Sequence, residues 1–303
     1  MKRIVKTALL IAAVFSGSQA MAQLSPMGAM YFQNQYLGNP ALAGTEAGLD
    51  LSLGIRKQWT NIPGSPAMQA FTGSYGLNEK VGLGLTVYND KAGLFKRTRT
   101  VASYAYHLPI SGDSKRLSFG LSLGFMNERI ATEDIRGNSG DANVGAYNQR
   151  DSYIDGDFGV AYTSDKFNIQ AAIPNMKSYL KKDINSDAVD RATFFSALSY
   201  KFQLEGGGGF GIEPKMAYRG VKGMDNIVDV GANLSYANSK VNLFGMYHST
   251  NSTTWGIGLN YQNIGFSGMY STATSALSSY ANDNFEVSMK VKLFNKQSRI
   301  QTP

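Results

Sequence analysis

The chain has 303 residues, no cysteine and two histidines, which excludes disulfides and cysteine chemistry and argues against a histidine-based metal centre. Its formal net charge of +7 comes from lysines and arginines scattered along the chain, a distribution that does not indicate nucleic-acid binding. Glycine, tyrosine and phenylalanine are abundant (33, 17 and 16), and no later stretch approaches the roughly 18 consecutive apolar residues of a spanning helix. A helical membrane protein is therefore excluded, whereas one that spans a membrane with strands is not.

The first 22 residues have the layout of a secretory signal peptide. Three basic residues precede the apolar run Ala8–Phe15, and Ala20-Met21-Ala22 has the small residues of a cleavage site. The apolar run is too short to cross a bilayer, which needs roughly 20 residues. We expect cleavage before Gln23, which lowers the net charge from +7 to +4 and leaves one exported domain of 281 residues.

Residues 23–47 show no steady hydrophobic period and contain the turn signal Asn39-Pro40. We expect this segment to precede the barrel and to fold into its lumen. The inward positions of later strands carry small residues, which leave room for it, and charges of both signs that neutralise one another. These positions are Gly82, Gly84, Gly256, Gly258, Glu213, Lys215, Arg219, Glu286, Lys290 and Lys292. The sequence therefore favours a plugged barrel over an open pore.

Strand-like alternation of apolar and polar residues begins at Leu49 and continues to the last regular stretch, Asn284–Phe294. In an exported chain this pattern predicts an all-β fold, a transmembrane outer-membrane β-barrel of about 14 antiparallel strands over residues 48–294. The last strand must pair with the first, because an open edge would leave unpaired backbone groups in hydrocarbon. Pro214 is expected to remove one ladder hydrogen bond. The first strand begins at residue 49, and the others are predicted near 67–76, 80–88, 98–108, 116–127, 153–163, 166–173, 191–204, 210–219, 227–237, 240–249, 253–262, 263–271 and 284–294.

The predicted connections alternate in length. Those after even-numbered strands are short, such as Ser164-Asp165, whereas the long segments Glu128–Ser152 and Pro174–Asp190 follow odd-numbered strands. Bacterial barrels have short periplasmic turns and long external loops. We therefore expect both termini, including the tail 295–303, in the periplasm and the long loops outside the cell. Strand-end tyrosines such as Tyr88 are expected in aromatic girdles at the two membrane interfaces.

No catalytic group is predicted. His248 and Ser249 are neighbours in a strand and point to opposite faces, so they cannot pair as base and nucleophile, and we interpret them as part of a polar rim. Gly206–Gly209 lacks the Lys-Ser/Thr and the helix of a phosphate cradle and is interpreted as a periplasmic turn. We expect neither an enzyme, nor a cofactor, nor a bound metal ion.

Four ordered motifs resemble one family. They are QNQYLGNPALAG at Gln33–Gly44, RKQW at Arg56–Trp59, IPGSPAMQ at Ile62–Gln69 and KVGLGLTVYNDKAG at Lys80–Gly93. In this first third the chain resembles the PorP/SprF family of outer-membrane proteins, which is associated with the type IX secretion and gliding machinery of Bacteroidota. The resemblance implies a non-enzymatic barrel that works by protein contact. The implied partner is the C-terminal domain of a secreted protein or adhesin, or a component of the periplasmic secretion ring or a lipoprotein.

The resemblance also implies a set of motif residues, for which barrel-building and direct partner contact are the two possible roles. They are Asn39, Pro40, Gly44, Arg56, Lys57, Gln58, Trp59, Asn89 and Asp90. Asn39-Pro40 is expected to fix a turn before the first strand and Gly44 to permit a bend.

The strand period gives the remaining motif residues a direction. Arg56 and Gln58 are expected to point into the lumen near the outer lip, and Lys57 and Trp59 toward lipid headgroups. Asn89 and Asp90 are expected to open the second external loop, where they cap a turn or face a ligand.

The alternative function is transport by a FadL-like channel for hydrophobic solutes. That family also carries an Asn-Pro-Ala motif near its N-terminus, compare Asn39–Ala43, and inward Phe244 and Met246 would suit an apolar ligand path. The series from Arg56 to Gly93 favours the secretion family instead.

Overall fold

The structure is a computed structural model of the chain. It describes residues 29–59, 64–111, 114–135, 142–149, 152–177, 192–203, 208–221, 225–272 and 284–294. The expected signal peptide, residues 23–28 of the expected plug, parts of the Glu128–Ser152 loop, most of the Pro174–Asp190 loop, Gly206 and Gly207 of the expected turn, and the tail 295–303 lie outside the described residues. No helix in the described ranges is long and apolar enough to cross a membrane.

The described residues form strands close to all fourteen predicted ones. The strands are β1 Gly48–Gln58, β2 Ala67–Gly76, β3 Val81–Ala92, β4 Phe95–Ser111, β5 Lys115–Ile130, β6 Tyr153–Thr163, β7 Phe167–Ile173, β8 Ala192–Tyr200, β9 Phe202–Gln203, β10 Gly211–Val221, β11 Ile227–Tyr236, β12 Val241–His248, β13 Ser252–Tyr261, β14 Ile264–Ser271 and β15 Asn284–Leu293. The agreement follows from the side-chain period of two, which any strand between lipid and a packed lumen must keep.

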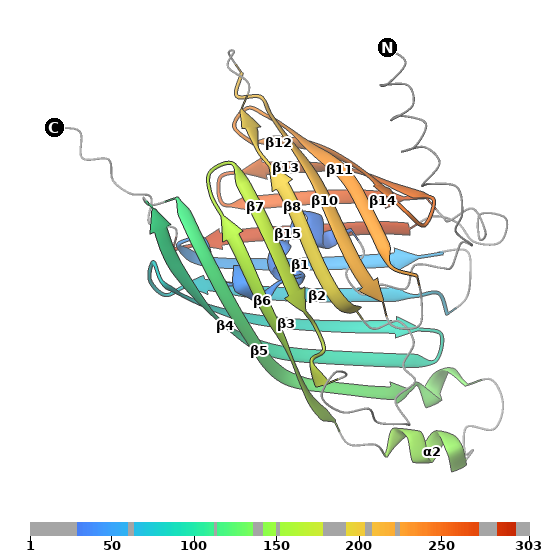
Figure 1. Ribbon diagram of the computed structural model, residues 1–303. Helices are drawn as coiled ribbons and strands as arrows, with labels where there is room; N and C mark the ends of the chain where they lie inside the picture. The colour runs from blue at the N-terminus through green and yellow to red at the C-terminus, as the bar shows by residue number, and fades with distance from the viewer. Residues whose placement is uncertain are drawn as a thin grey trace, which may run out of the picture.

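The sheet closes on itself. β15 pairs antiparallel with β1, from Leu49 opposite Leu293 to Gln58 opposite Asn284, and β10 pairs with β11 to complete the ring. The result is a closed antiparallel barrel of 14 strands with β9 as one extra strand (Figure 1). The predicted pairing of the last strand with the first is confirmed.

The extra strand arises where the predicted eighth strand is interrupted at Lys201. β10 pairs with β8 up to Lys215 opposite Ser199 and resumes with β9 at Ile212 opposite Phe202. Pro214 lies in this gap and has no N–H to donate. The interruption is therefore located where the sequence predicts a lost ladder hydrogen bond.

The two ends of the barrel differ. β1 begins and β15 ends at one end, which we call the terminal end; the opposite end is the loop end. At the loop end, the segment between β5 and β6 contains the 3₁₀ helix η4 (Thr132–Asp134) and the helix α2 (Ala142–Asn148), which lies beside the end of β5 in Figure 1. Asn148 fastens this helix to the strand, because its side chain accepts a hydrogen bond from Ile130 N (2.7 Å) and donates one to Ile130 O (2.9 Å).

The prediction that Asn89 and Asp90 open the second external loop is wrong. β3 and β4 continue past the expected boundary and are joined by Gly93-Leu94 alone, so that Asn89 lies opposite Thr98 and Asp90 opposite Arg97. Polar residues that leave the membrane need no loop, because a hydrogen-bonded hairpin can continue in water, and Gly93 with φ +60° supplies the tight turn. β5 extends alongside to Ile130, so β3, β4 and β5 form a wall at the loop end, which we call the β3–β5 wall.

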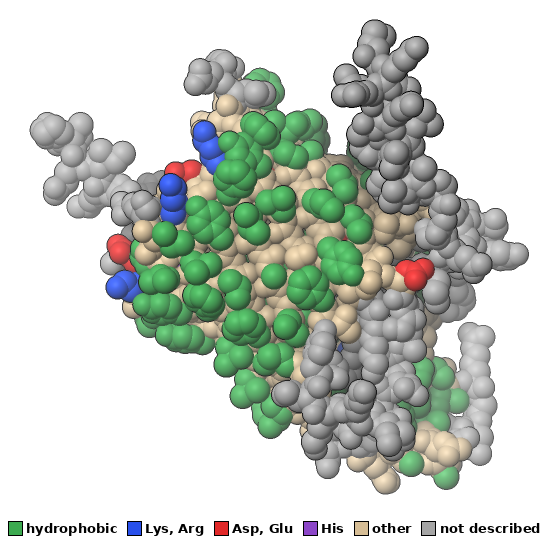
Figure 2. All heavy atoms as spheres, in the orientation of Figure 1, with side chains coloured by type: hydrophobic (Ala, Val, Ile, Leu, Met, Phe, Trp, Pro, Cys, Tyr) green, Lys and Arg blue, Asp and Glu red, His purple; other side chains and the backbone are tan. Residues whose placement is uncertain are grey.

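The outer surface of the barrel is apolar. Outward side chains such as Leu123 (63% exposed), Phe125 and Val287 are largely exposed, and Figure 2 shows hydrophobic side chains spread over one face, with charges of both signs near the edge on the left. This is the surface that a lipid bilayer requires. Tyr88 is not part of this outer surface. Its neighbour Val87 points outward, so alternation turns Tyr88 into the lumen, and the prediction that Tyr88 lies in an aromatic girdle is wrong.

Candidate functional site: the plug inside the barrel

Residues 29–47, which we call the plug, lie inside the barrel (Figure 1). They form three short 3₁₀ helices, η1 Met30–Phe32, η2 Gln35–Leu37 and η3 Pro40–Leu42. Such short helices have little stability of their own. Their side chains pack instead on the inner wall, where full burial of each large apolar one contributes about 1.5–3 kcal/mol. The buried apolar side chains are Ala29, Met30, Tyr31, Phe32, Tyr36, Ala41, Leu42 and Ala43.

Glycines of the wall let the plug backbone approach. A Cβ at Gly82 would lie 2.0 Å from Ala43 O, and one at Gly84 would lie 2.2 Å from Tyr36 Oη. Gly120 and Gly159, which face each other on β5 and β6, form a flat platform under residues 39–41. The expectation that inward glycines leave room for the plug thus holds for Gly82 and Gly84. Gly256 and Gly258, in contrast, accommodate the wall side chains Phe244 and Asn242.

Asn39 pins the plug to the wall and is fully buried. Its Oδ1 accepts a hydrogen bond from Ala41 N (2.9 Å) and so caps η3, which has Pro40 at its first position. Its Nδ2 donates to Val160 O (3.1 Å) on β6 and to Ala171 O (3.3 Å) on β7. One side chain therefore orders the plug turn and ties it to two strands.

Replacing Asn39 by alanine is expected to destabilise the barrel by about 2–3 kcal/mol, because the cap is lost and buried carbonyls lose a donor. The free energy of unfolding in urea, measured for protein refolded in lipid vesicles, checks this. Asn34→Ala is the matched control, since within the described ranges the Asn34 side chain makes one part-buried hydrogen bond, to Thr72 Oγ1 at 2.8 Å, and its loss should cost about 1 kcal/mol. Equal losses for the two variants would contradict the role of Asn39.

The plug leaves the lumen at the terminal end through Gly44 and Glu46. Gly44 has φ +63° and its N–H donates to Ser74 Oγ (2.6 Å), while a Cβ there would lie 2.5 Å from Gly82 Cα. Glu46 forms ion pairs with Lys292 and with Lys290 (4.0 Å) on β15. Burial alone would raise the pKa of the Glu46 carboxyl, but these two ammonium groups outweigh it and hold its pKa below the usual 4.5.

A depressed folded-state pKa gives the Glu46 contact a defined pH dependence. The contact stabilises the plug exit fully above the unfolded value of 4.5, and the stabilisation is lost as the pH falls through the lower folded value. We expect hydrogen exchange at residues 44–47, corrected for the intrinsic rate, to accelerate between about pH 6 and pH 3. In a Glu46→Gln variant the corrected exchange should not change with pH, and a response equal to that of the wild type would contradict the assignment.

The other half of the plug is held by a buried charge cluster on β10, β11 and β12. Arg219 donates from Nε and Nη2 to the Asp229 carboxylate (2.7 and 2.9 Å), and Tyr31 Oη donates to the same carboxylate. His248 Nδ1 lies 2.5 Å from Asp229 Oδ1 and its Nε2 lies 2.7 Å from Thr254 Oγ1. His248 is 2% exposed, which corrects its interpretation as a polar rim residue: the strand turns it inward, where Asp229 compensates its burial.

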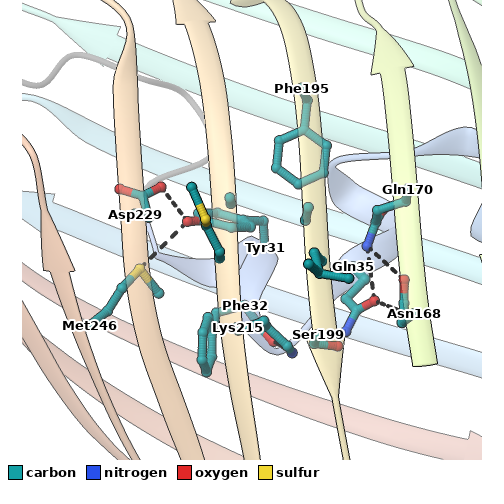
Figure 3. Close-up of a pocket in the computed structure, with 14 residues that line it drawn as sticks. Tyr31, Phe32, Gln35, Asn168, Gln170, Phe195, Ser199, Lys215, Asp229 and Met246 are labelled. Atoms are coloured by element: carbon teal, nitrogen blue, oxygen red, sulfur yellow. Dashed lines mark hydrogen bonds between the residues drawn. The ribbon is translucent and has the colours of Figure 1, made fainter. Parts of the chain in front are cut away.

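Figure 3 shows Tyr31 and Phe32 of the plug beside the wall residues that line this side of the lumen. Tyr31 lies against residues of β8 and β11, and Phe32 against residues of β10 and β12, where its ring lies 5.8 Å from that of Phe244. Lys215 Nζ donates to Phe32 O (3.1 Å), and the remaining cavity of about 10 Å³ has room for about one water molecule. Phe244 and Met246 do face inward as predicted, but the plug occupies the apolar path that they would line.

The RKQW motif lies at the loop end of β1. Arg56 and Gln58 are buried inside and Lys57 is exposed outside, as the alternation predicts. Arg56 Nε lies 3.5 Å from Glu286 Oε1, and the Glu286 carboxylate accepts hydrogen bonds from Ala29 N (3.0 and 3.1 Å). Arg56 therefore helps to hold the start of the described plug. β1 ends at Gln58 and Trp59 has φ +48°, so the alternation does not extend to Trp59.

Two motif residues lie in the β3–β5 wall. Asn89 Oδ1 accepts a hydrogen bond from Thr98 Oγ1 (2.9 Å) across the hairpin, and Asp90 faces Arg97, whose Nε donates to Glu128 Oε1 (3.0 Å). Their direct contact with a partner stays a prediction. The structure does not bring them together with Asn39, Pro40 or Gly44, which lie in the plug.

The plug separates two larger cavities. One of about 60 Å³ lies between residues 36–40 and the strands β2, β3, β4 and β6, and Pro174 and Asn175 at the loop end complete its lining. The other, of about 610 Å³, opens toward the terminal end and is lined mostly by polar side chains, among them Arg116, Lys201 and Lys290. In the described part of the chain, residues of the plug thus line both cavities.

Sequence reasoning missed the buried ion pairs Arg99–Asp157 and Arg219–Asp229 as pairs. Arg99 Nη2 lies 2.5 Å from Asp157 Oδ1, and both residues are buried. A signal was present, because alternation already places Arg99, Asp157 and Asp229 at inward positions, where a charge needs a partner. Which of these charges pair depends on which strands lie next to or across from each other in the barrel. The residue pattern of a single strand does not give this information.

Comparison with known proteins gives one family and no curated relative. The family model of the type IX secretion system membrane protein PorP/SprF matches residues 20–291, and no curated protein matches. The outer membrane protein Omp33 of Acinetobacter baumannii is similar in structure, with 9% identity, a TM-score of 0.48 and coverage of 82% of this chain and 100% of that chain. The toluene transporter TbuX of Ralstonia pickettii has 12% identity and a TM-score of 0.49, with coverage of 91% and 96%. This outer-membrane β-barrel belongs to the PorP/SprF family of type IX secretion system membrane proteins.

Proposed function

We propose that this barrel is a contact protein of the type IX secretion system, which holds the C-terminal domain of a secreted protein or adhesin at the cell surface. In this proposal the loop end faces the outside and the terminal end the periplasm. The observation that carries it is the plugged lumen: the plug contacts the wall from Glu286 near the loop end to Gly82 near the terminal end, which favours a barrel that offers surfaces over one that offers a pore. The role requires no catalytic group.

The β3–β5 wall is the surface that we assign to the secreted partner. Its polar side chains are tied by ion pairs, Lys91 with Asp134 (2.6 Å) and Arg97 with Glu128 (3.0 Å), which keep it stiff. At its tip Phe95 is 56% exposed and lies against Tyr147 of α2, with 5.9 Å between the rings. An exposed aromatic on a rigid polar frame is the kind of anchor on which protein interfaces depend.

A strain that lacks this chain tests the anchor. We expect type IX secreted surface proteins to move from the cell fraction to the medium, and wild-type protein to restore them to the cells. Phe95→Lys should fail to restore them, because it places a charge at the centre of the proposed contact. Tyr261→Lys, a matched change of an exposed aromatic at the terminal end, should restore them.

Two other locations of the secreted proteins in the deletion strain would point to a different function. Accumulation of the secreted proteins in the periplasm would show a part of the secretion machinery, whose ring or lipoprotein components would then contact the terminal end and its cavity of about 610 Å³. Retention of the surface proteins on the cells of the deletion strain would contradict the anchor altogether.

The second candidate function is the FadL-like channel for hydrophobic solutes. The inward apolar side chains of Phe244 and Met246 favour a path for a hydrophobic solute. Phe32 and Tyr31 of the plug, however, lie against them. We expect the wild-type protein in planar bilayers to show no large single-channel conductance. A large conductance would favour transport.

A further inference from the structure

The cavity of about 60 Å³ on the loop-end side of the plug contains an unused buried hydrogen-bond donor. Arg99 on β4 is 6% exposed and lines this cavity, and among the described residues its Nε has no hydrogen-bond partner. Buried polar groups in proteins are nearly always paired, and a charged donor left without an acceptor is costly. The position therefore points to an acceptor that enters from outside the described chain.

The surroundings of Arg99 define what that acceptor can be. Asp157 already neutralises the guanidinium from the Nη2 side, and its own oxygens accept from Asn175 N (2.9 Å) and Ser122 Oγ (2.6 Å). The guanidinium is thus fixed in place, its charge is compensated, and the free edge is Nε–H. A neutral carbonyl oxygen suits this edge better than a second carboxylate, which would find no uncompensated positive charge there.

The rest of the cavity suits a short side chain. Met68 and Ala70 of β2 and Val101 of β4 contribute apolar lining, and Tyr36 and Pro40 of the plug also line the cavity. A volume of about 60 Å³ exceeds that of a single water, which needs about 10–15 Å³ on this scale. An amide side chain, with an apolar stem and a carbonyl at its tip, matches both the space and the donor.

We propose that this cavity, which we call the Arg99 pocket, receives an amide side chain from the C-terminal domain of the secreted protein, whose carbonyl oxygen accepts the Arg99 Nε–H. The inference rests on the proposed function, since it supplies the specific contact within the anchor. It also gives the plug a second role: residues 36–40 form one side of the pocket, so the binding site exists only while the plug is in place.

A photoreactive residue in the pocket tests the proposal. Tyr88 lines the pocket, and p-azidophenylalanine at position 88 is nearly isosteric with tyrosine. The same probe at Phe95 reports contact with the wall outside the pocket. The full chain is tagged in its native membrane, irradiated and purified in mild detergent, and the crosslinked peptides are identified by mass spectrometry. We expect the probe at position 88 to capture a peptide from the C-terminal domain of a secreted protein.

Variants of the two arginines separate the donor from its charge. Arg99→Lys keeps a cation beside Asp157 but removes the Nε–H, so we expect recovery of the secreted protein with the tagged barrel to fall about tenfold. Arg116→Lys is the matched control, because its side chain lines the cavity of about 610 Å³ at the terminal end and lies outside the pocket, and it should leave recovery unchanged. Heat-modifiable mobility on electrophoresis verifies that each variant is folded.

The outcomes are distinguishable. Crosslinks to the secreted protein from position 95 but none from position 88 would overturn the Arg99 pocket and leave the anchor standing. Crosslinks from position 88 to lipid alone, or equal recovery with Arg99→Lys and Arg116→Lys, would also overturn the pocket. If no secreted protein is recovered with the wild-type barrel, the proposed function fails and the pocket with it.

Discussion

Replacing Gly159 by valine is expected to expel the plug and convert the closed barrel into a conducting one. A Cβ at this position would lie 1.9 Å from Asn39 Oδ1 and 3.0 Å from Pro40 Cδ. Asn39 cannot yield, since its side chain is bound to two strands and to Ala41 N. Overpacking costs about 1–3 kcal/mol even where neighbours can move, and each 1.4 kcal/mol changes the population of the seated plug about tenfold.

The absence of native cysteine makes this change directly measurable. A single cysteine at Ala41, which is 0% exposed, should react slowly with a water-soluble maleimide in the wild-type background and at least about tenfold faster with Gly159→Val. Planar-bilayer recordings should show conductance for the variant. Gly268→Val is the control, because a Cβ there meets no atom within 4 Å. Equal labelling rates in the wild-type, Gly159→Val and Gly268→Val backgrounds would contradict the close packing of the plug on Gly120 and Gly159.

Replacing Arg219 by methionine is expected to cost about 3–5 kcal/mol, the largest loss of stability among single substitutions considered for this chain. Arg219 is 1% exposed and its two hydrogen bonds compensate the buried Asp229 carboxylate. Without Arg219 this carboxylate remains in the wall with Tyr31 and His248 as its other partners. Tyr31 should loosen with it, so the plug half near Phe32 becomes labile as well.

The urea unfolding midpoint in vesicles measures the loss, and two further variants identify its cause. Arg219→Met combined with Asp229→Asn should recover most of the stability, because the double variant leaves no unpaired charge. Lys292→Met removes a partly exposed pair with Glu46 and should cost at most about 1 kcal/mol. If the double variant is as unstable as Arg219→Met alone, the loss is one of packing and the charge argument is wrong.

The wall of this barrel could be predicted from the sequence because strands between lipid and a filled lumen repeat every two residues. Alternation predicts the strands and the inward direction of Arg56 and Phe244, and the cost of an open edge in hydrocarbon predicts the closing pair of β1 and β15. It failed where the membrane ends, because polar residues such as Asn89 and Asp90 look like a loop although the hairpin continues in water. Tyr88 lies near a strand end, which suggests an aromatic girdle, but its phase in the strand turns it inward.

The interior of the plug could not be predicted in the same way. Its segment has no period, and its partners lie far away in the sequence: Asn39 binds Ala171 and Tyr31 binds Asp229. Such contacts exist only after the barrel has closed. Two local features did carry information, the Asn39-Pro40 pair that caps η3 and the inward glycines Gly82 and Gly84 under the plug. The pocket around Arg99 is lined by residues of both the plug and the wall. Neither segment of the sequence alone contains a pattern that predicts it.

The measurement that tests the central claim most directly is quantitative mass spectrometry of the tagged barrel purified in mild detergent from its native outer membrane. The account predicts a secreted surface protein in near-equal amount, held through its C-terminal domain. Recovery of periplasmic ring or lipoprotein components instead would place the chain in the secretion machine, and recovery of lipid or fatty acid alone would contradict a contact function and favour transport.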